Sequence, residues 1–163
     1  MVRLKSRYIL FEIVYPTGTD SITSSLETGK DIFLRHHQIT PPDISSKTLL
    51  QEIRKSLQLN FGDYGLGKVS SLLQVKYFSN MTSTGILRCH REDCDLLVMA
   101  LFLMKKISNT DRVIVNPIKV SGTIKKIEEY SCRRNQRLLS IIKQDYECRV
   151  DDFTCISEDE EQE

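Results

Sequence analysis

The sequence predicts an α+β protein whose strands and helices follow the order β-α-β-β-α-β, with one more helix at the C-terminal end. Two observations carry this prediction. Short segments of alternating apolar residues, typical of strands with one buried face, are interspersed with segments whose apolar residues recur every three or four positions, typical of helices. The 163 residues, 40% hydrophobic and 28% charged, are sufficient for one compact domain with its own core.

The first half of the chain predicts one strand, a loop insertion and one helix. Residues 3–15 alternate and are rich in β-forming side chains, so we expect a strand there. Residues 16–42 have turn formers at both ends and no clear period, which predicts a variable loop insertion with a short helix near 30–38. Asp43 then suits the N-cap of a helix that ends near Asn60. The apolar face of this helix comprises Leu49, Leu50, Ile53 and Leu57.

A β-hairpin follows. The segment GDYGLGK, residues 62–68, lacks the glycine spacing of a phosphate-binding loop and predicts a flexible turn. Residues 72–80 and 86–91 have the composition of strands, and the short polar segment 81–85 between them predicts the turn of a hairpin.

A second helix is expected directly after the hairpin. Acidic side chains open it and Lys105 and Lys106 close it, which is the charge distribution that the helix dipole favours. The stretch from Leu96 to Met104 is apolar on nearly every side, so we expect this helix to be largely buried. The acidic residues at its start are Glu92, Asp93 and Asp95.

A strand at 113–122 and a helix from Thr123 to about Lys143 complete the fold. Pro117 indicates an edge strand or a bulge, because proline cannot donate a ladder hydrogen bond. The order of elements fits a ferredoxin-like, RRM-like α/β sandwich with an added C-terminal helix, in which two helices cover one face of the sheet and the other stays free. The inward residues of the last helix are predicted to be Ile124, Ile127, Leu138, Ile141 and Ile142.

The net charge of +1 conceals an asymmetry. Residues 151–163 hold seven acidic side chains and no lysine or arginine, so residues 1–150 carry 23 basic and 15 acidic side chains, a formal charge of +8. We therefore expect one RRM-like domain over 1–146 and a disordered acidic tail over 147–163. A basic folded body predicts an anionic partner.

Several classes of protein are disfavoured. The longest apolar run has nine residues, too few to cross a bilayer, and the N-terminus does not have the pattern of a signal peptide. The five cysteines are an odd number, which argues against a disulfide framework. These features predict an intracellular protein that does not insert into a membrane.

The segment GILRCHREDC, residues 85–94, holds side chains that suit several kinds of chemistry. Cys89, His90 and Cys94 offer at most three metal ligands, and adjacent strand residues point to opposite faces, so we expect no metal site. The same geometry disfavours a Cys–His nucleophile unless His36 or His37 supplies the base. A ferredoxin-like enzyme or small-molecule regulatory domain that uses residues 85–95 is the alternative function.

Basic residues occur in three sets that can converge near one edge of the sheet, which predicts binding to the backbone of a folded RNA. The aromatic signature of an RRM that stacks single-stranded bases is absent. Residues 121–123 can also offer backbone N–H groups to a phosphate at the start of a helix. The predicted RNA-binding residues are Arg3, Lys5, Arg7, Arg88, His90, Arg91, Lys119, Ser121, Gly122, Thr123, Lys125, Lys126, Arg133 and Arg134.

Five segments together carry a specific resemblance, and they cover most of residues 1–144. The chain resembles a family of small RRM-like subunits, the fifth of the "processing of precursor RNAs" subunits, shared by eukaryotic ribonuclease P and ribonuclease MRP, in a yeast-like form. Residues 16–42 and the part after Lys143 do not match closely. The matching segments are MVRLKSRYILFEI, LLQEIRKSLQLNFGDYG, SLLQVKYFSN, TSTGILRCHREDCDLLVMAL, and IVNPIKVSGTIKKIEE followed by RRN.

The resemblance implies a non-catalytic RNA-binding subunit located in the nucleus and nucleolus. In that family the RNA cleaves the phosphodiester with its own metal ions, so no cofactor is expected on this chain. Ribonuclease P removes 5′ leaders from precursor tRNA, and ribonuclease MRP cuts precursor rRNA. The implied partners are ribonuclease P RNA, MRP RNA, a TIM-barrel-like subunit and other proteins of the complexes, without a small-molecule substrate. A free sheet face that binds protein instead of RNA is a further alternative.

Overall fold

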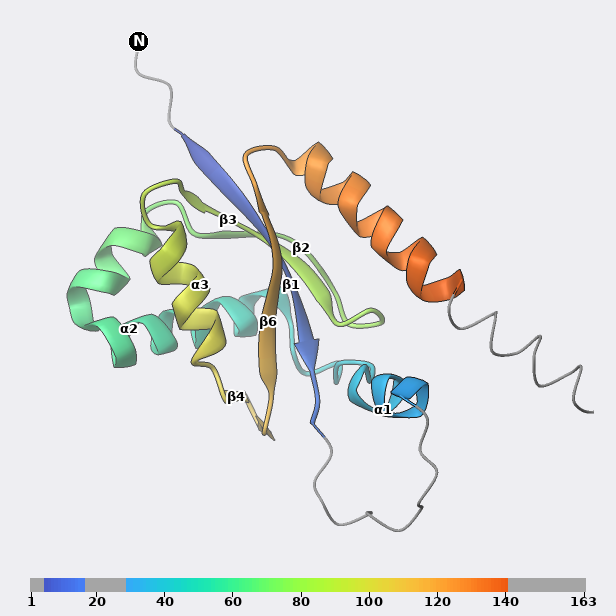
Figure 1. Ribbon diagram of the computed structural model, residues 1–163. Helices are drawn as coiled ribbons and strands as arrows, with labels where there is room; N and C mark the ends of the chain where they lie inside the picture. Colours follow the sequence, from blue (N-terminus) through green and yellow to red (C-terminus); the bar gives the residue numbers. More distant parts are fainter. Residues whose placement is uncertain (1–4, 17–28, 141–163) are drawn as a thin grey trace, which may run out of the picture. The chain divides into compact units, whose positions relative to one another are not determined.

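A four-stranded antiparallel sheet is the centre of the molecule (Figure 1). The computed structural model describes residues 5–16 and 29–140. The chain divides into two compact units, residues 1–127 and 128–163, and each is described by itself. The first unit contains the sheet and its covering helices.

The sheet has the strand order β2-β3-β1-β6, and each neighbouring pair is antiparallel. Its strands are β1 (Ser6–Val14), β2 (Gln74–Ser79), β3 (Thr84–His90) and β6 (Ile114–Ser121). This order places β1 and β3 in the middle and confirms the predicted ferredoxin-like arrangement. β6 is an edge strand with a register shift opposite Leu10 and Phe11, beside Pro117, as the proline predicted.

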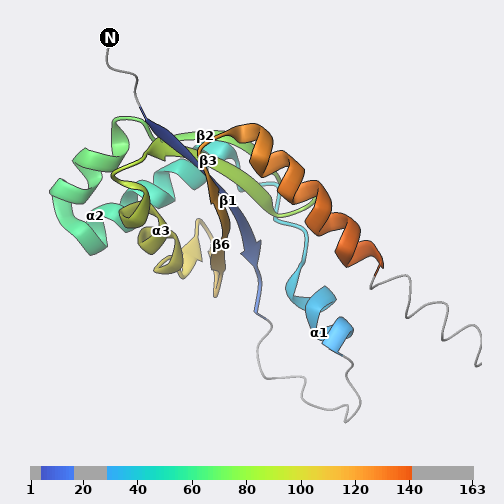
Figure 2. The ribbon, with the colours of Figure 1, turned by 45° about the horizontal axis from the view of Figure 1, so that its top comes forward.

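Two helices cover one face of the sheet, α2 (Ser46–Ser70) and α3 (Cys94–Phe102), and both views show them on the same side (Figure 1, Figure 2). The short helix α1 (Gly29–His36) lies where the insertion was predicted to contain one. Odd-numbered residues of β1 enter the core with apolar residues of α2 and α3. Fully buried members of this core include Ile9, Phe11, Ile13, Ile53, Leu57, Leu87 and Leu97.

The second face of the sheet, defined as the face turned away from α2 and α3, is not free at its centre. Leu10 and Ile86 are paired across β1 and β3 and are 3% and 6% exposed, yet neither belongs to the core cluster. Ile127, at the end of the first unit, is also fully buried outside that cluster. The prediction of a free face is therefore wrong at this point, because the low exposure of Leu10, Ile86 and Ile127 means that other residues cover them.

The helix α2 begins later than predicted. Its N-cap is Ser45, whose Oγ accepts a hydrogen bond from the Thr48 N–H at 3.2 Å, and not Asp43. Within α2, Gly62 has non-helical backbone angles, a φ of 64° and a ψ of −165°, so two helical segments meet there. The first segment therefore ends close to the predicted position near Asn60. The predicted turn is confined to Gly62, because the residues that follow it are helical up to Ser70.

The helix α3 is shorter and more exposed than predicted. It ends at Phe102, so Lys105 and Lys106 do not lie in its last turn, and Lys106 begins a two-stranded hairpin that the sequence did not indicate. The hairpin consists of β4 (Lys106–Ile107) and β5 (Thr110–Asp111). The outer side of α3 is exposed, because a two-layer fold can cover only one side of a helix.

A helix over residues 124–140 follows β6, in agreement with the predicted C-terminal helix. Ile127 is buried as predicted, whereas Ile124 is 37% exposed.

Several predictions concern parts outside the described residues. They are the role of Arg3, most of the insertion at 17–28, the inward positions Ile141 and Ile142, and the boundary between the domain ending at 146 and the tail at 147–163.

We predict that Gly85→Ala destabilises the fold. A Cβ at this position would collide with Cζ of Phe11, whose ring is fully buried, so the core has to shift. Overpacking of this kind costs about 1–3 kcal/mol in the free energy of unfolding, measured by denaturant titration. Gly67→Ala is the control, because its Cβ meets nothing within 4 Å and alanine favours the helix. Equal stabilities of the two variants would contradict the close packing of Phe11 on β3.

Candidate nucleic-acid interface

The sheet topology brings described members of the three basic sets toward one end of the first unit, namely Lys5 and Arg7, Arg88 to Arg91, and Lys119. Since β1 runs antiparallel to both β3 and β6, its N-terminal end lies beside the C-terminal ends of those two strands. Two contacts demonstrate this proximity. The Arg91 N–H donates a hydrogen bond to the Lys5 carbonyl at 2.9 Å, and a Cβ on Gly122 would lie 3.1 Å from Nη1 of Arg7.

Four of the predicted residues share the second face of the sheet. Tyr8 of β1 is opposite Arg88 on one side and Ser121 on the other. His90 is opposite Ser6, and Lys119 is opposite Leu10, so both lie on the same face. Neighbouring strands are about 4.8 Å apart, which places the backbones of Arg88 and Ser121 about 10 Å from each other across Tyr8. We call Arg88, His90, Lys119 and Ser121 the basic cluster.

Arg88 has an unusual hydrogen-bonding state within this cluster. Its Nε atom is shielded from solvent and has no hydrogen-bond partner among the described residues. A shielded donor without an acceptor costs free energy, so native structures rarely leave one unpaired. Because Nε is shielded, only the rest of the half-buried Arg88 side chain can meet another molecule.

Arg7 does not belong to the basic cluster. It is paired with Cys89, so its side chain starts from the face that α2 and α3 cover, and it reaches the end of the sheet near Gly122. Lys5 and Arg91 are exposed at the same end. These three cations extend the positive charge around the end of the sheet, beyond the second face.

The start of the C-terminal helix differs from the predicted phosphate site in one respect. The Thr123 N–H donates to Oγ of Ser121 at 3.4 Å, so the protein itself satisfies one of the N–H groups expected to bind phosphate. Gly122, Lys125 and Lys126 are exposed beside it.

Arg133 and Arg134 lie in the second unit, residues 128–163. Nε of Arg133 donates to the Glu129 carbonyl at 3.3 Å, within its own helix. The predicted RNA-binding role of these two arginines stays a prediction.

The cysteines of the segment 85–94 lie in the core. Cys89 is fully buried and Cys94 is 6% exposed, and Cys89 and His90 belong to opposite faces of β3. A hydrogen bond with Cys94, together with burial, raises the pKa of the Cys89 thiol, and the same hydrogen bond lowers the pKa of Cys94. A buried thiol with a raised pKa is a poor nucleophile. The described part of the chain groups no three His, Cys, Asp or Glu residues in a way that could hold a metal ion.

We predict that Cys89 resists alkylation in the native protein. Its burial and raised pKa keep the reactive thiolate scarce and inaccessible, whereas Cys132 is exposed. Iodoacetamide treatment followed by peptide mass spectrometry should find Cys132 modified and Cys89 unmodified until the protein is denatured. Rapid native labelling of Cys89 would instead favour the enzyme alternative at residues 85–95.

The fold is that of a small α+β protein with an antiparallel sheet that carries the basic cluster on one face. Within residues 5–16 and 29–140, no helix is both long and apolar enough to span a bilayer. A model of the Rpp14/Pop5 family matches residues 7–132, so the chain belongs to that family.

Two proteins of similar sequence carry the same subunit name. The chain is 56% identical to "Ribonuclease P/MRP protein subunit POP5" of Saccharomyces cerevisiae, over 100% of this chain and 98% of the relative. It is 43% identical to the protein of the same name in Schizosaccharomyces pombe, over 83% and 89% of the two chains. A chain in the cryo-EM structure of yeast ribonuclease MRP is 14% identical, with a TM-score of 0.45, and the alignment covers 83% of this chain and 98% of that one.

The sequence patterns identified the basic residues but missed two features of the site. They did not place Tyr8 at the centre of the basic cluster, although the alternation of residues 3–15 already put Tyr8 on the face opposite Ile9. They also did not separate Arg7 from Arg88, because the register between β1 and β3 is a tertiary property.

Proposed function

We propose that this chain is a non-catalytic, RNA-binding protein subunit of the ribonuclease P and ribonuclease MRP ribonucleoproteins. In this role it stabilises the catalytic RNA for removal of 5′ leaders from precursor tRNA and for processing of precursor rRNA. The observation that carries the proposal is the 56% identity to the yeast subunit over the whole chain. The alternative of an enzyme or small-molecule domain at residues 85–95 has no support, since both cysteines of that segment are buried.

The basic cluster supports RNA as the ligand of the second face. Arg88 and Lys119 lie on the two strands that flank β1, on the same face of the sheet, where their positive charges favour phosphate. Because the cluster has one central aromatic residue, Tyr8, and no RRM stacking signature, contact with the RNA backbone is the proposed mode.

The remaining assignments extend the same proposal. The partners are ribonuclease P RNA, MRP RNA, a TIM-barrel-like protein subunit and other proteins of the two complexes. The chain itself binds no cofactor, since the metal ions of the reaction belong to the RNA. Its location is the nucleus and nucleolus, where these RNAs are processed.

We predict that Arg88→Ala combined with Lys119→Ala weakens binding to ribonuclease P RNA by about 10- to 100-fold, since two charge-assisted contacts are lost. The slope of log K against log salt should fall by about two units. Filter binding of the full chain over a range of salt concentrations measures both quantities. Lys47→Ala combined with Arg54→Ala is the matched control, because both residues are exposed on α2, away from the second face. Unchanged affinity and slope in the first variant would contradict an RNA-binding second face.

We also predict that the chain replaces its 56% identical relative in Saccharomyces cerevisiae. In cells depleted of that relative, expression of this chain should prevent the accumulation of precursor tRNA with its 5′ leader, measured on RNA blots. The Arg88→Ala, Lys119→Ala variant should restore processing less well than the Lys47→Ala, Arg54→Ala control. Accumulation of precursor despite normal expression of the unaltered chain would refute the proposed role.

A further inference from the structure

The exposed side of α3 carries a stripe of large apolar side chains. Met99 is 51% exposed, Phe102 52% and Leu103 43%. Their spacing of three and four residues places them on one side of the helix. Leu59 belongs to α2, the other helix that covers this face of the sheet, and is 86% exposed. Apolar surface of this kind on a folded protein marks sites of association with other molecules.

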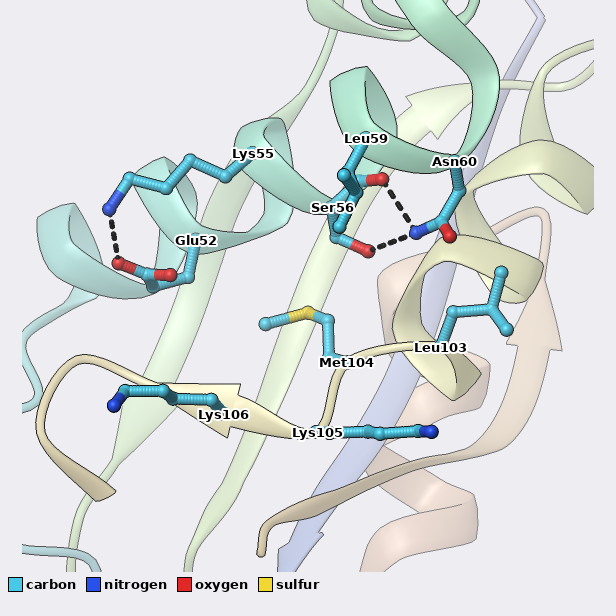
Figure 3. Close-up of a pocket in the computed structure, with 9 residues that line it drawn as sticks. All are labelled: Glu52, Lys55, Ser56, Leu59, Asn60, Leu103, Met104, Lys105 and Lys106. Atoms are coloured by element: carbon cyan, nitrogen blue, oxygen red, sulfur yellow. Dashed lines mark hydrogen bonds and ion pairs between the residues drawn. The ribbon is translucent and has the colours of Figure 1, made fainter. Parts of the chain in front are cut away.

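This stripe leads into a groove between α2 and the segment that follows α3. The groove has a volume of about 290 Å³, and Leu59, Leu103 and Met104 form its apolar part (Figure 3). Figure 3 shows Met104 reaching from the segment after α3 toward α2. All residues of the groove belong to the first unit, residues 1–127.

Lysines surround the groove and make it positive. Lys55 pairs with Glu52 at 2.7 Å, and Lys106 pairs with Asp111 at 2.9 Å. Lys105 lines the groove as well, and its ammonium group has no ion-pair partner in the part of the chain that the structure describes. Exposed ion pairs contribute little to stability, so an incoming carboxylate can replace the present partners at small cost.

We propose that this groove and the adjoining stripe bind an acidic, amphipathic segment of a partner protein. Apolar side chains of the segment would cover Leu59, Phe102 and Leu103, and its carboxylates would pair with the lysines. Aromatic residues and methionine are enriched in the cores of protein interfaces, and an amphipathic helix in a groove is a common mode of recognition. RNA is the less suitable occupant, because phosphates gain nothing from exposed aliphatic side chains. This site goes beyond the proposed RNA-binding function, because it is formed by α2 and the segment after α3, whereas the basic cluster lies on the sheet face turned away from those helices.

Site-specific photocrosslinking tests the proposal in the assembled complex. The full chain, with p-benzoylphenylalanine in place of Leu103, is expressed in Saccharomyces cerevisiae instead of its relative, and the purified complex is irradiated. Mass spectrometry should locate the adduct in a protein peptide that contains both acidic and large apolar residues. An adduct with RNA, an adduct with a basic peptide, or the absence of an adduct would each overturn the proposal.

A second probe separates this proposal from the proposed function. p-Benzoylphenylalanine in place of Gln74, which is exposed opposite Arg88, should form adducts with RNA. If the Gln74 probe fails to label RNA while the Leu103 probe labels an acidic peptide, RNA binding by the second face is wrong and the protein-binding groove stands.

Charge reversal tests the chemistry of the occupant. Lys105→Glu should lower the adduct yield of the Leu103 probe by about three- to tenfold. Lys47→Glu is the control, because Lys47 is exposed on α2 but does not line the groove, and its yield should not change. Equal yields in the two variants would overturn the acidic character of the partner. Thermal unfolding of both variants checks that each remains folded.

Discussion

The central position of β1 is the constraint on which the other features of the molecule depend. This strand is hydrogen-bonded to β3 on one side and to β6 on the other, antiparallel to both. Its odd-numbered residues Ile9, Phe11 and Ile13 anchor the core, while its even-numbered residues lie on the second face. A shift of one residue in either register would exchange the two faces. Core packing and the placement of the basic cluster are therefore set by the same pairing.

The two layers of the first unit offer two chemically different surfaces. The second face of the sheet carries the cations Arg88 and Lys119 on the two sides of β1. The helical layer carries exposed apolar side chains of α2 and α3 bordered by lysines. The proposed RNA-binding surface and the proposed protein-binding groove therefore lie on different layers, so their ligands would not compete for the same contacts.

The errors of the sequence-based predictions have identifiable physical causes. The segment Leu96–Met104 is apolar on all sides, and periodicity alone could not show which side the sheet leaves uncovered. The glycines at 62–68 suggested a turn, and Gly62, with its positive φ, does interrupt α2, but the residues after it are helical, so the turn is shorter than predicted. The hairpin of β4 and β5 has strands of two residues, too short for an alternating pattern.

The sequence by itself determined the order of the four sheet strands and their helices, an edge strand or bulge at Pro117, the apolar face of α2 and the basic character of the RNA-binding candidates, because these depend on local periodicity and composition. The resemblance of whole segments also identified the family. The tertiary structure alone decided which basic residues share a face, because Arg7 and Arg88 are separated by strand register and not by sequence. It likewise decided that Met99 and Phe102 stay exposed, since exposure depends on which neighbours a helix meets.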